Sequence, residues 1–160
     1  MVEDLAPDGS RAPGGPSLYA ARTAAALGAR VTLVTRLTPG YDRRVLAGVE
    51  VHALPATAVP CYANSYDAAG DRTQLLLDPG EPLDATLALD PPADALIVAP
   101  AYHEFAALPV IPARLLALSL QGILRRVDGA RRVLQEPEPA TATLPFTAPG
   151  SFAFDPAPPA

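Results

Sequence analysis

Two adjacent glycines at the start of a predicted helix are the first feature of this sequence that could bind a ligand. Gly14 and Gly15 precede SLYAARTAAAL, a run of good helix formers. The first turn of a helix exposes backbone N–H groups and the positive end of its dipole, which together favour oxygen-rich ligands. A dinucleotide-binding loop is one interpretation, although the preceding GSRAP is no buried strand and the spacing is not GxGxxG. Glycines that only shape a loop are another.

The sequence offers few other residues for catalysis or metal binding. All 12 basic residues are arginine, so the chain has no lysine for a P-loop or a Schiff base. His52 has no partner histidine nearby in the sequence, and His103-Glu104 is not part of an HExxH motif, so we expect no metal site. No serine lies in a GxSxG elbow. The single cysteine, Cys61, excludes an internal disulfide, and we interpret it as a small buried side chain.

The net charge and the lengths of the apolar runs predict the location of the protein and its partners. A net charge of −5 and an isoelectric point near 4.9 argue against general binding to nucleic acid or to an anionic membrane. The first twenty residues lack the apolar core of a signal peptide, and the longest apolar stretches, such as LIVAPAY, are too short to span a membrane. We therefore expect a cytoplasmic protein with no nucleic-acid or membrane partner.

Residue periodicity predicts an α/β order of elements. A helix over 17–27 is framed by Pro16 and Gly28, the usual asymmetry of helix ends. A β-hairpin over 61–77 would turn at 68–71, where a glycine supplies a positive φ. The remaining predicted strands are 31–36, 49–55, 94–100 and 115–121. This succession of helix and strands is typical of an α/β fold.

The end of the chain differs in composition from the rest. Residues 134–160 hold seven of the chain's 20 prolines and show no apolar periodicity. Such a segment buries too little apolar surface to offset the entropy of ordering it. We therefore divide the chain into one domain over 1–133 and a proline-rich disordered tail over 134–160.

Residues 13–36, PGGPSLYAARTAAALGARVTLVTR, resemble the first signature of the ribokinase-like (PfkB) carbohydrate kinases. The hairpin 61–77 falls where that family has lid strands, and DALIVAP and LLALSLQG resemble its later parallel strands. The resemblance covers residues 2 to about 130. It implies an α/β fold, a ribokinase-like (Rossmann-like) partial sheet with a projecting hairpin lid. Tyr19 stands where many members have Asn, and the strand that should precede Asp4 is almost absent.

The resemblance also implies site residues. Asp4 would bind substrate hydroxyls beside Gly14 and Gly15, and the hairpin would close over a sugar or nucleoside through Asn64, Arg72 and Gln74. A solvated strand face is the alternative for these three hairpin residues. After the last strand, three residues stand where open parallel sheets bind ligands: Gln121, Gly122 and Arg125. They could approach a nucleotide or phosphate, or they could simply cap the strand end.

The family's catalytic element is missing from this sequence. Phosphoryl transfer there needs a Gly-x-Gly-Asp element whose N–H groups hold the phosphate and whose Asp accepts a proton. The nearest approximation, Ala69-Gly70-Asp71, lies inside the predicted hairpin and lacks the first glycine. We therefore predict no catalytic residue. ATP and Mg²⁺ are implied by the resemblance only.

Three classes of function remain open. The first is an incomplete ribokinase-like sugar or nucleoside kinase that cannot transfer phosphate alone. The second is a non-catalytic small-molecule binder or a homodimer formed through the lid. For that dimer we expect an apolar hairpin face, with Leu75 and Leu77 on one arm and Tyr62 and Tyr66 on the other, to meet a second copy. The third is a Rossmann-type nucleotide-binding protein.

Overall fold

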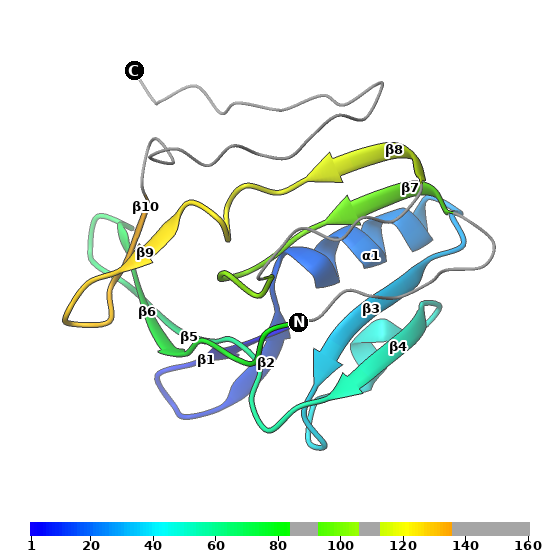
Figure 1. Cartoon of the computed structure of the whole chain (residues 1–160). Helices are drawn as coiled ribbons and strands as arrows, with labels where there is room; N and C mark the ends of the chain where they lie inside the picture. Colours follow the sequence, from blue (N-terminus) through cyan, green and yellow to red (C-terminus); the bar gives the residue numbers. More distant parts are fainter. Residues whose placement is uncertain (84–92, 106–112, 136–160) are drawn as a thin grey trace.

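The structure is a computed structural model that describes residues 1–83, 93–105 and 113–135 (Figure 1). The elements, in chain order, are β1 (Val2–Leu5), β2 (Arg11–Gly14), α1 (Pro16–Ala26), β3 (Thr32–Leu37), the 3₁₀ helix η1 (Arg43–Leu46), β4 (Glu50–Pro55), β5 (Cys61–Tyr66), β6 (Arg72–Asp78), β7 (Ala93–Val98), β8 (Ala113–Leu118), β9 (Arg125–Val127) and β10 (Val133–Gln135). The described residues are therefore rich in strand, with α1 as their one α-helix.

Helix α1 forms where the sequence predicts it. Pro16 occupies the first turn, where a missing N–H costs nothing, and alanine dominates the interior. The helix ends at Ala26, and Gly28 just beyond it has a φ of 88° that suits glycine. Ala29 N–H then donates to Ala24 O at 3.0 Å, which satisfies a carbonyl of the last turn. In the described residues no helix is long and apolar enough to cross a membrane.

Two pairs of parallel strands confirm the predicted strands on both sides of the hairpin. Strand β3 pairs with β4, and β7 pairs with β8. All four strands run in the same general direction in Figure 1, and α1 runs the opposite way beside them. Leu18 of α1 packs with Leu33 and Leu37 of β3 in one buried cluster, which also contains Tyr41. This is the local arrangement of a helix covering a parallel sheet.

A mixed four-stranded sheet, in the order β2-β1-β5-β6, forms the other part of the molecule. Residues 1–15 supply β1 and β2, two strands that the sequence did not predict. Strand β1 pairs antiparallel with β2 and parallel with β5, so that Asp4 lies beside Tyr62. Such short strands, with two acidic residues, give no alternating pattern of their own. Strand β1 forms because β5 offers it an edge, and β2 forms because β1 offers it one in turn.

The predicted hairpin forms, and it is part of the mixed sheet, which is separate from the two parallel strand pairs. Its arms pair antiparallel, and β1 continues the sheet on one side. On the other side, Leu76 N–H donates to Arg131 O at 2.9 Å, which brings the β9–β10 hairpin alongside β6. Both sides of the hairpin therefore contact other strands, and its role as a lid stays a prediction.

The expected apolar face of the hairpin is also wrong. Tyr62 pairs with Leu76, so alternation along β6 places Leu75 and Leu77 on the opposite face from Tyr62. Tyr62 is only 1% exposed and packs with Val2 and Leu76 in a second buried cluster. The homodimer through this hairpin stays a prediction.

The end of the described chain adds strands that the sequence did not predict. Strands β9 and β10 pair antiparallel, and Val127 and Val133 pack against the second cluster. Leu134 and Gln135, which the sequence places in the tail, therefore belong to a strand. The rest of the proposed tail, 136–160, lies outside the described residues.

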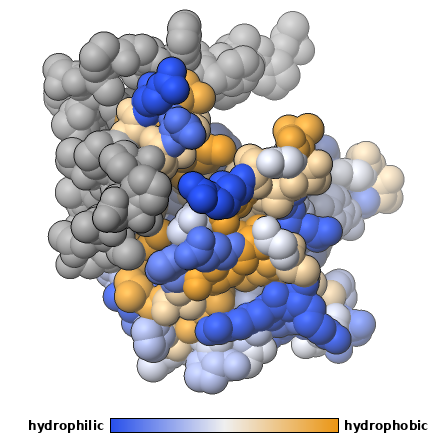
Figure 2. All heavy atoms as spheres, turned by 90° about the vertical axis from the view of Figure 1, so that its right-hand side faces the viewer, coloured by the Kyte–Doolittle hydropathy of each residue, from blue (hydrophilic) through white to orange (hydrophobic). Residues whose placement is uncertain are grey.

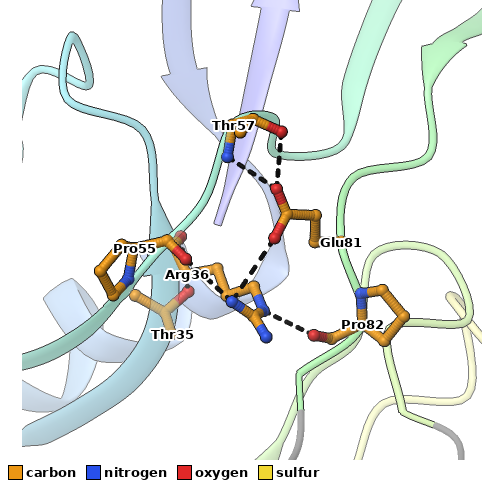
Figure 3. A network of polar contacts seen from close by, with 6 residues as sticks. All are labelled: Thr35, Arg36, Pro55, Thr57, Glu81 and Pro82. Atoms are coloured by element: carbon orange, nitrogen blue, oxygen red, sulfur yellow. Dashed lines mark hydrogen bonds and ion pairs between the residues drawn. The ribbon is translucent and has the colours of Figure 1, made fainter.

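Arg36, at the carboxyl end of β3, joins three segments that are distant in sequence (Figure 3). Its guanidinium donates to Pro55 O at 2.8 Å and to Pro82 O at 2.5 Å, and it pairs with Glu81 at 3.6 Å. Glu81 in turn accepts from the N–H and the hydroxyl of Thr57, both at 2.7 Å. These hydrogen bonds lower the pKa of Glu81. The network fixes the chain after β6 against the ends of β3 and β4.

A buried hydroxyl gives a direct test of how β1 is held. Tyr41 is 4% exposed and donates to Val2 O at 3.1 Å, and burial raises the pKa of this hydroxyl so that it stays protonated. Tyr41→Phe leaves that buried carbonyl without its partner, so we expect a loss of about 1 kcal/mol in the free energy of unfolding. Chemical denaturation measures it. Tyr66→Phe, at an exposed tyrosine, should change stability by less than about 0.5 kcal/mol. Equal effects of the two would contradict the assignment.

Candidate functional site

Three residues that the resemblance indicates form one hydrogen-bonded series on a face of the mixed sheet. Asn64 Nδ2 donates to Asp4 Oδ1 at 3.0 Å, and Gln74 Nε2 donates to Asn64 Oδ1 at 2.8 Å. The three side chains come from β1, β5 and β6, which are neighbours in the sheet. All three are half-buried. The sheet therefore brings Asp4 and Asn64, which are 60 positions apart, into one polar row with Gln74.

The carboxylate determines how the two amides in this row are oriented. An ionised Asp only accepts hydrogen bonds, so Asn64 must present its NH₂ group to Asp4. The Asn64 carbonyl oxygen then faces Gln74, which must present its own NH₂ group. Asp4 Oδ2 and the Gln74 carbonyl oxygen remain as acceptors at the ends of the row. The face is suited to a ligand that donates several hydrogen bonds.

The glycine pair lies directly against β1. A Cβ at Gly14 would collide with the Asp4 carboxylate, and a Cβ at Gly15 would come within 2.5 Å of Val2 Cγ2. Gly15 also has a φ of 95°, which side-chain-bearing residues rarely adopt. Glycine is therefore required at Gly15, a side chain at Gly14 would displace the Asp4 carboxylate, and the start of α1 lies beside Asp4.

Beside the polar row lies a buried aromatic residue that sequence reasoning did not assign to the site. Tyr62 is on β5, two residues before Asn64 and on the same face of the sheet. Its hydroxyl donates to Ala101 O at 2.9 Å, and burial raises the pKa of Tyr62 to about 12 although Arg125 is close. Alternation along CYANSY is the signal that could have placed Tyr62 here. It marks the point where this face of the sheet becomes buried.

Two of the predicted residues lie apart from this row. Arg72 is exposed at the start of β6, opposite Tyr66, and lies two residues before Gln74 on the same face. No hydrogen bond joins it to the row in the residues described. Gln121 is exposed in the turn that follows β8.

Gly122 and Arg125 have packing roles in this structure. Arg125 is 8% exposed, donates to Ala101 O at 3.0 Å and lies 5.1 Å from the centre of the Tyr62 ring. A Cβ at Gly122 would collide with the backbone of Pro100. The guanidinium is thus directed into the core and the glycine is covered. These residues do not fit the phosphates of ATP.

Nothing in the described residues fits Mg²⁺ either. No group of three potential metal-ligating side chains comes together within 1–83, 93–105 and 113–135. Glu104, which lies near Tyr62, accepts hydrogen bonds from the backbone N–H groups of Ala101 and Tyr102. Its carboxylate is used to shape the turn after β7.

The triplet Ala69-Gly70-Asp71 is the turn of the hairpin. The N–H groups of Ala69 and Asp71 both donate to Asp67 Oδ1 at 2.9 Å, and that of Gly70 donates to Asp67 O at 3.1 Å. All three N–H groups are therefore engaged with one residue. They are not directed at a phosphate.

The packing role of Gly122 gives a measurable prediction. Gly122→Ala forces the turns after β7 and β8 apart, so we expect it to lower the free energy of unfolding by about 1–3 kcal/mol. Gly40→Ala is the matched control, because a Cβ there meets no atom within 4 Å. Chemical denaturation of both variants measures the difference. A Gly122→Ala protein as stable as the control would show that the two turns do not pack this way.

Comparison with known proteins relates this arrangement to one fold. No family model and no curated protein matches the sequence. Among solved structures, the chain is similar to a pyrophosphate-dependent kinase of the ribokinase family complexed with a pyrophosphate analog and myo-inositol, with a TM-score of 0.62 and 22% identity. The match covers 84% of this chain and 52% of that one.

Two further solved structures agree. A sulfate complex of a pyrophosphate-dependent ribokinase-family kinase matches with a TM-score of 0.62 and 20% identity, covering 84% of this chain and 51% of that one. A pyrophosphate-dependent myo-inositol-1 kinase, converted into a myo-inositol-3 kinase by two substitutions, matches with a TM-score of 0.63 and 20% identity over 84% and 50%. The chain spans about half the length of the kinases it matches. It therefore has a ribokinase-like fold, as the glycine-pair signature implied.

Proposed function

We propose that this chain is the substrate-binding portion of a ribokinase-like small-molecule kinase, and that its substrate is a neutral polyol. The row of Asp4, Asn64 and Gln74 beside Gly14 is the observation that carries the proposal. Fold similarity alone does not determine function. The row adds chemistry that suits hydroxyl groups, and the kinases of similar fold include one bound to myo-inositol.

The ligand class follows from the donors and acceptors on the face. A carboxylate accepts hydrogen bonds from two hydroxyls at once, and the Gln74 carbonyl oxygen adds a further acceptor. An anionic ligand would be repelled by Asp4, whereas a cyclic polyol or the ribose of a nucleoside supplies adjacent O–H donors. Gly14 allows the start of α1 to lie against the carboxylate without a side chain between them.

Binding should therefore depend on the Asp4 charge. We expect myo-inositol, ribose or a nucleoside to raise the melting temperature of the wild-type protein. Asp4→Asn keeps the shape but replaces one acceptor oxygen with an NH₂ group, and should weaken binding about tenfold or more in calorimetric titration. Asp8→Asn is the matched control, because Asp8 is an exposed turn residue that bonds only to Ser10 in the described structure.

The same screen separates the alternatives. Stabilisation by NAD(P) and not by polyols would favour a Rossmann-type nucleotide binder. If Asp4→Asn binds the polyol as tightly as the wild type does, the row of Asp4, Asn64 and Gln74 is not part of the binding site. Binding without any transfer activity is expected of both the kinase portion and a non-catalytic binder, so activity needs its own test.

We expect this chain by itself to transfer no phosphate from ATP or from pyrophosphate to a polyol. The Gly-x-Gly-Asp element is absent from its sequence, and the N–H groups of Ala69-Gly70-Asp71 are engaged with Asp67. Purified protein, a polyol that binds and each phosphate donor in turn should give no phosphorylated product by mass spectrometry. Product formation that Asp71→Asn abolishes would contradict this and place the catalytic base in the hairpin turn.

A further inference from the structure

The face of the sheet that carries the polar row continues along the β5–β6 hairpin toward its turn. Alternate residues of a strand share a face, and residues paired directly across two strands share it as well. In order from the core to the turn, this face carries the pairs Tyr62–Leu76, Asn64–Gln74 and Tyr66–Arg72. Two residues along an antiparallel strand span about 7 Å, so a ligand on the middle pair would reach the outer pair with a second ring.

Exposure rises along this face toward the turn. Tyr62 is 1% exposed and packs with Ala101, whereas Tyr66 is 66% exposed. The residues of the polar row lie between these extremes and are half-buried. In Figure 1 the turn of the hairpin lies on the left, on the opposite side of the molecule from β3 and β4. A ligand held by the row is therefore blocked toward Tyr62 and free to extend toward Tyr66.

The two side chains of the outer pair have no partner in the part of the chain that the structure describes. There, neither the Tyr66 hydroxyl nor the Arg72 guanidinium makes a hydrogen bond or an ion pair. A tyrosine ring offers an apolar face for stacking, and a guanidinium offers several donors in a fixed planar fork. The outer pair thus presents a flat apolar surface beside a set of hydrogen-bond donors.

The charges around the outer pair argue against an anionic substituent on the ligand. Asp67 and Asp71 are exposed in the turn next to Arg72, and Asp4 lies at the end of the row. A negative substituent would meet the repulsion of these three carboxylates as well as the attraction of one guanidinium. A neutral ring with hydrogen-bond acceptors can accept from Arg72 without that repulsion.

Exposed apolar surface by itself does not mark a site in this protein. Figure 2 faces the right-hand side of Figure 1, away from the hairpin turn, and hydrophobic side chains lie there between hydrophilic ones. Ile97 of β7, for instance, is 52% exposed. Tyr66 differs from such residues because it shares a face with the polar row and is paired with an arginine.

We propose that Tyr66 and Arg72 form a second subsite, which binds a neutral planar ring joined to the polyol that the row holds. This inference rests on the proposed function and narrows its substrate to a polyol that carries an unsaturated ring with hydrogen-bond acceptors, as a nucleoside does. The Tyr66 ring stacks on the face of that planar ring. The Arg72 guanidinium donates to its acceptors.

Calorimetric titration of the full chain with three ligands tests the subsite. Ribose occupies the row alone, phenyl riboside adds a planar ring without acceptors on it, and uridine adds a planar ring with acceptors. We expect the wild type to bind uridine about tenfold or more tightly than ribose, with phenyl riboside between them. Equal affinities for all three would overturn the subsite alone. If none of the three binds, the proposed function fails and the subsite fails with it.

Substitutions separate the contributions of the two side chains. Tyr66→Ala should weaken the binding of uridine and of phenyl riboside about tenfold and leave ribose unchanged, whereas Tyr66→Phe should retain all three affinities. Arg72→Ala should weaken uridine about fivefold and leave phenyl riboside unchanged. Ile97→Ala and Arg114→Ala are the matched controls, at an exposed apolar residue of β7 and an exposed arginine of β8, and should change none of the affinities.

The variants also show how the proposal would fail. If Tyr66→Ala weakens ribose as much as uridine, the tyrosine only stabilises the hairpin, and the subsite is overturned. The subsite is equally overturned if Tyr66→Ala keeps the preference for uridine over ribose. If phenyl riboside binds as tightly as uridine and Arg72→Ala changes neither, the requirement for acceptors on the ring is wrong.

Discussion

The close approach of two glycines to strand β1 is the constraint on which the rest of the structure depends. A side chain at Gly14 would displace the Asp4 carboxylate, and one at Gly15 would collide with Val2. Because neither has one, β2 can pair with β1 and the chain can enter α1 at once. That helix start then sets where Leu18 packs under β3, so the glycines connect the mixed sheet to the parallel strands.

Polar groups in this protein divide into those that stabilise the core and those that face outward. Arg125 is buried, where the Tyr62 ring and the Ala101 carbonyl oxygen offset part of the cost of removing its charge from water. Asp4 and Gln74 lie on the mixed sheet and remain half-exposed, and their remaining acceptors are Asp4 Oδ2 and the Gln74 carbonyl oxygen. The two sets of residues differ in burial and not in polarity, because the side chains in both are charged or strongly polar.

Local patterns predicted the elements that have a clear period or clear ends. The helix over 17–27 and the parallel strands around it were correct, since Pro16, Gly28 and apolar runs are read from neighbouring residues. The strands β1, β2, β9 and β10 were missed. Each is only three or four residues long, and its conformation depends on a partner strand that is distant in sequence.

The sequence by itself indicated the candidate ligand-binding residues, through the glycine pair and its resemblance to a family signature. Only the tertiary structure decided which of them meet. Asp4 and Asn64 come together because β1 pairs parallel with β5. Arg125, in contrast, is buried in the core, so it is not available to contact a ligand. Local conformation is encoded by residues a few positions apart, whereas strand pairing and burial depend on contacts between distant segments, which no local pattern specifies.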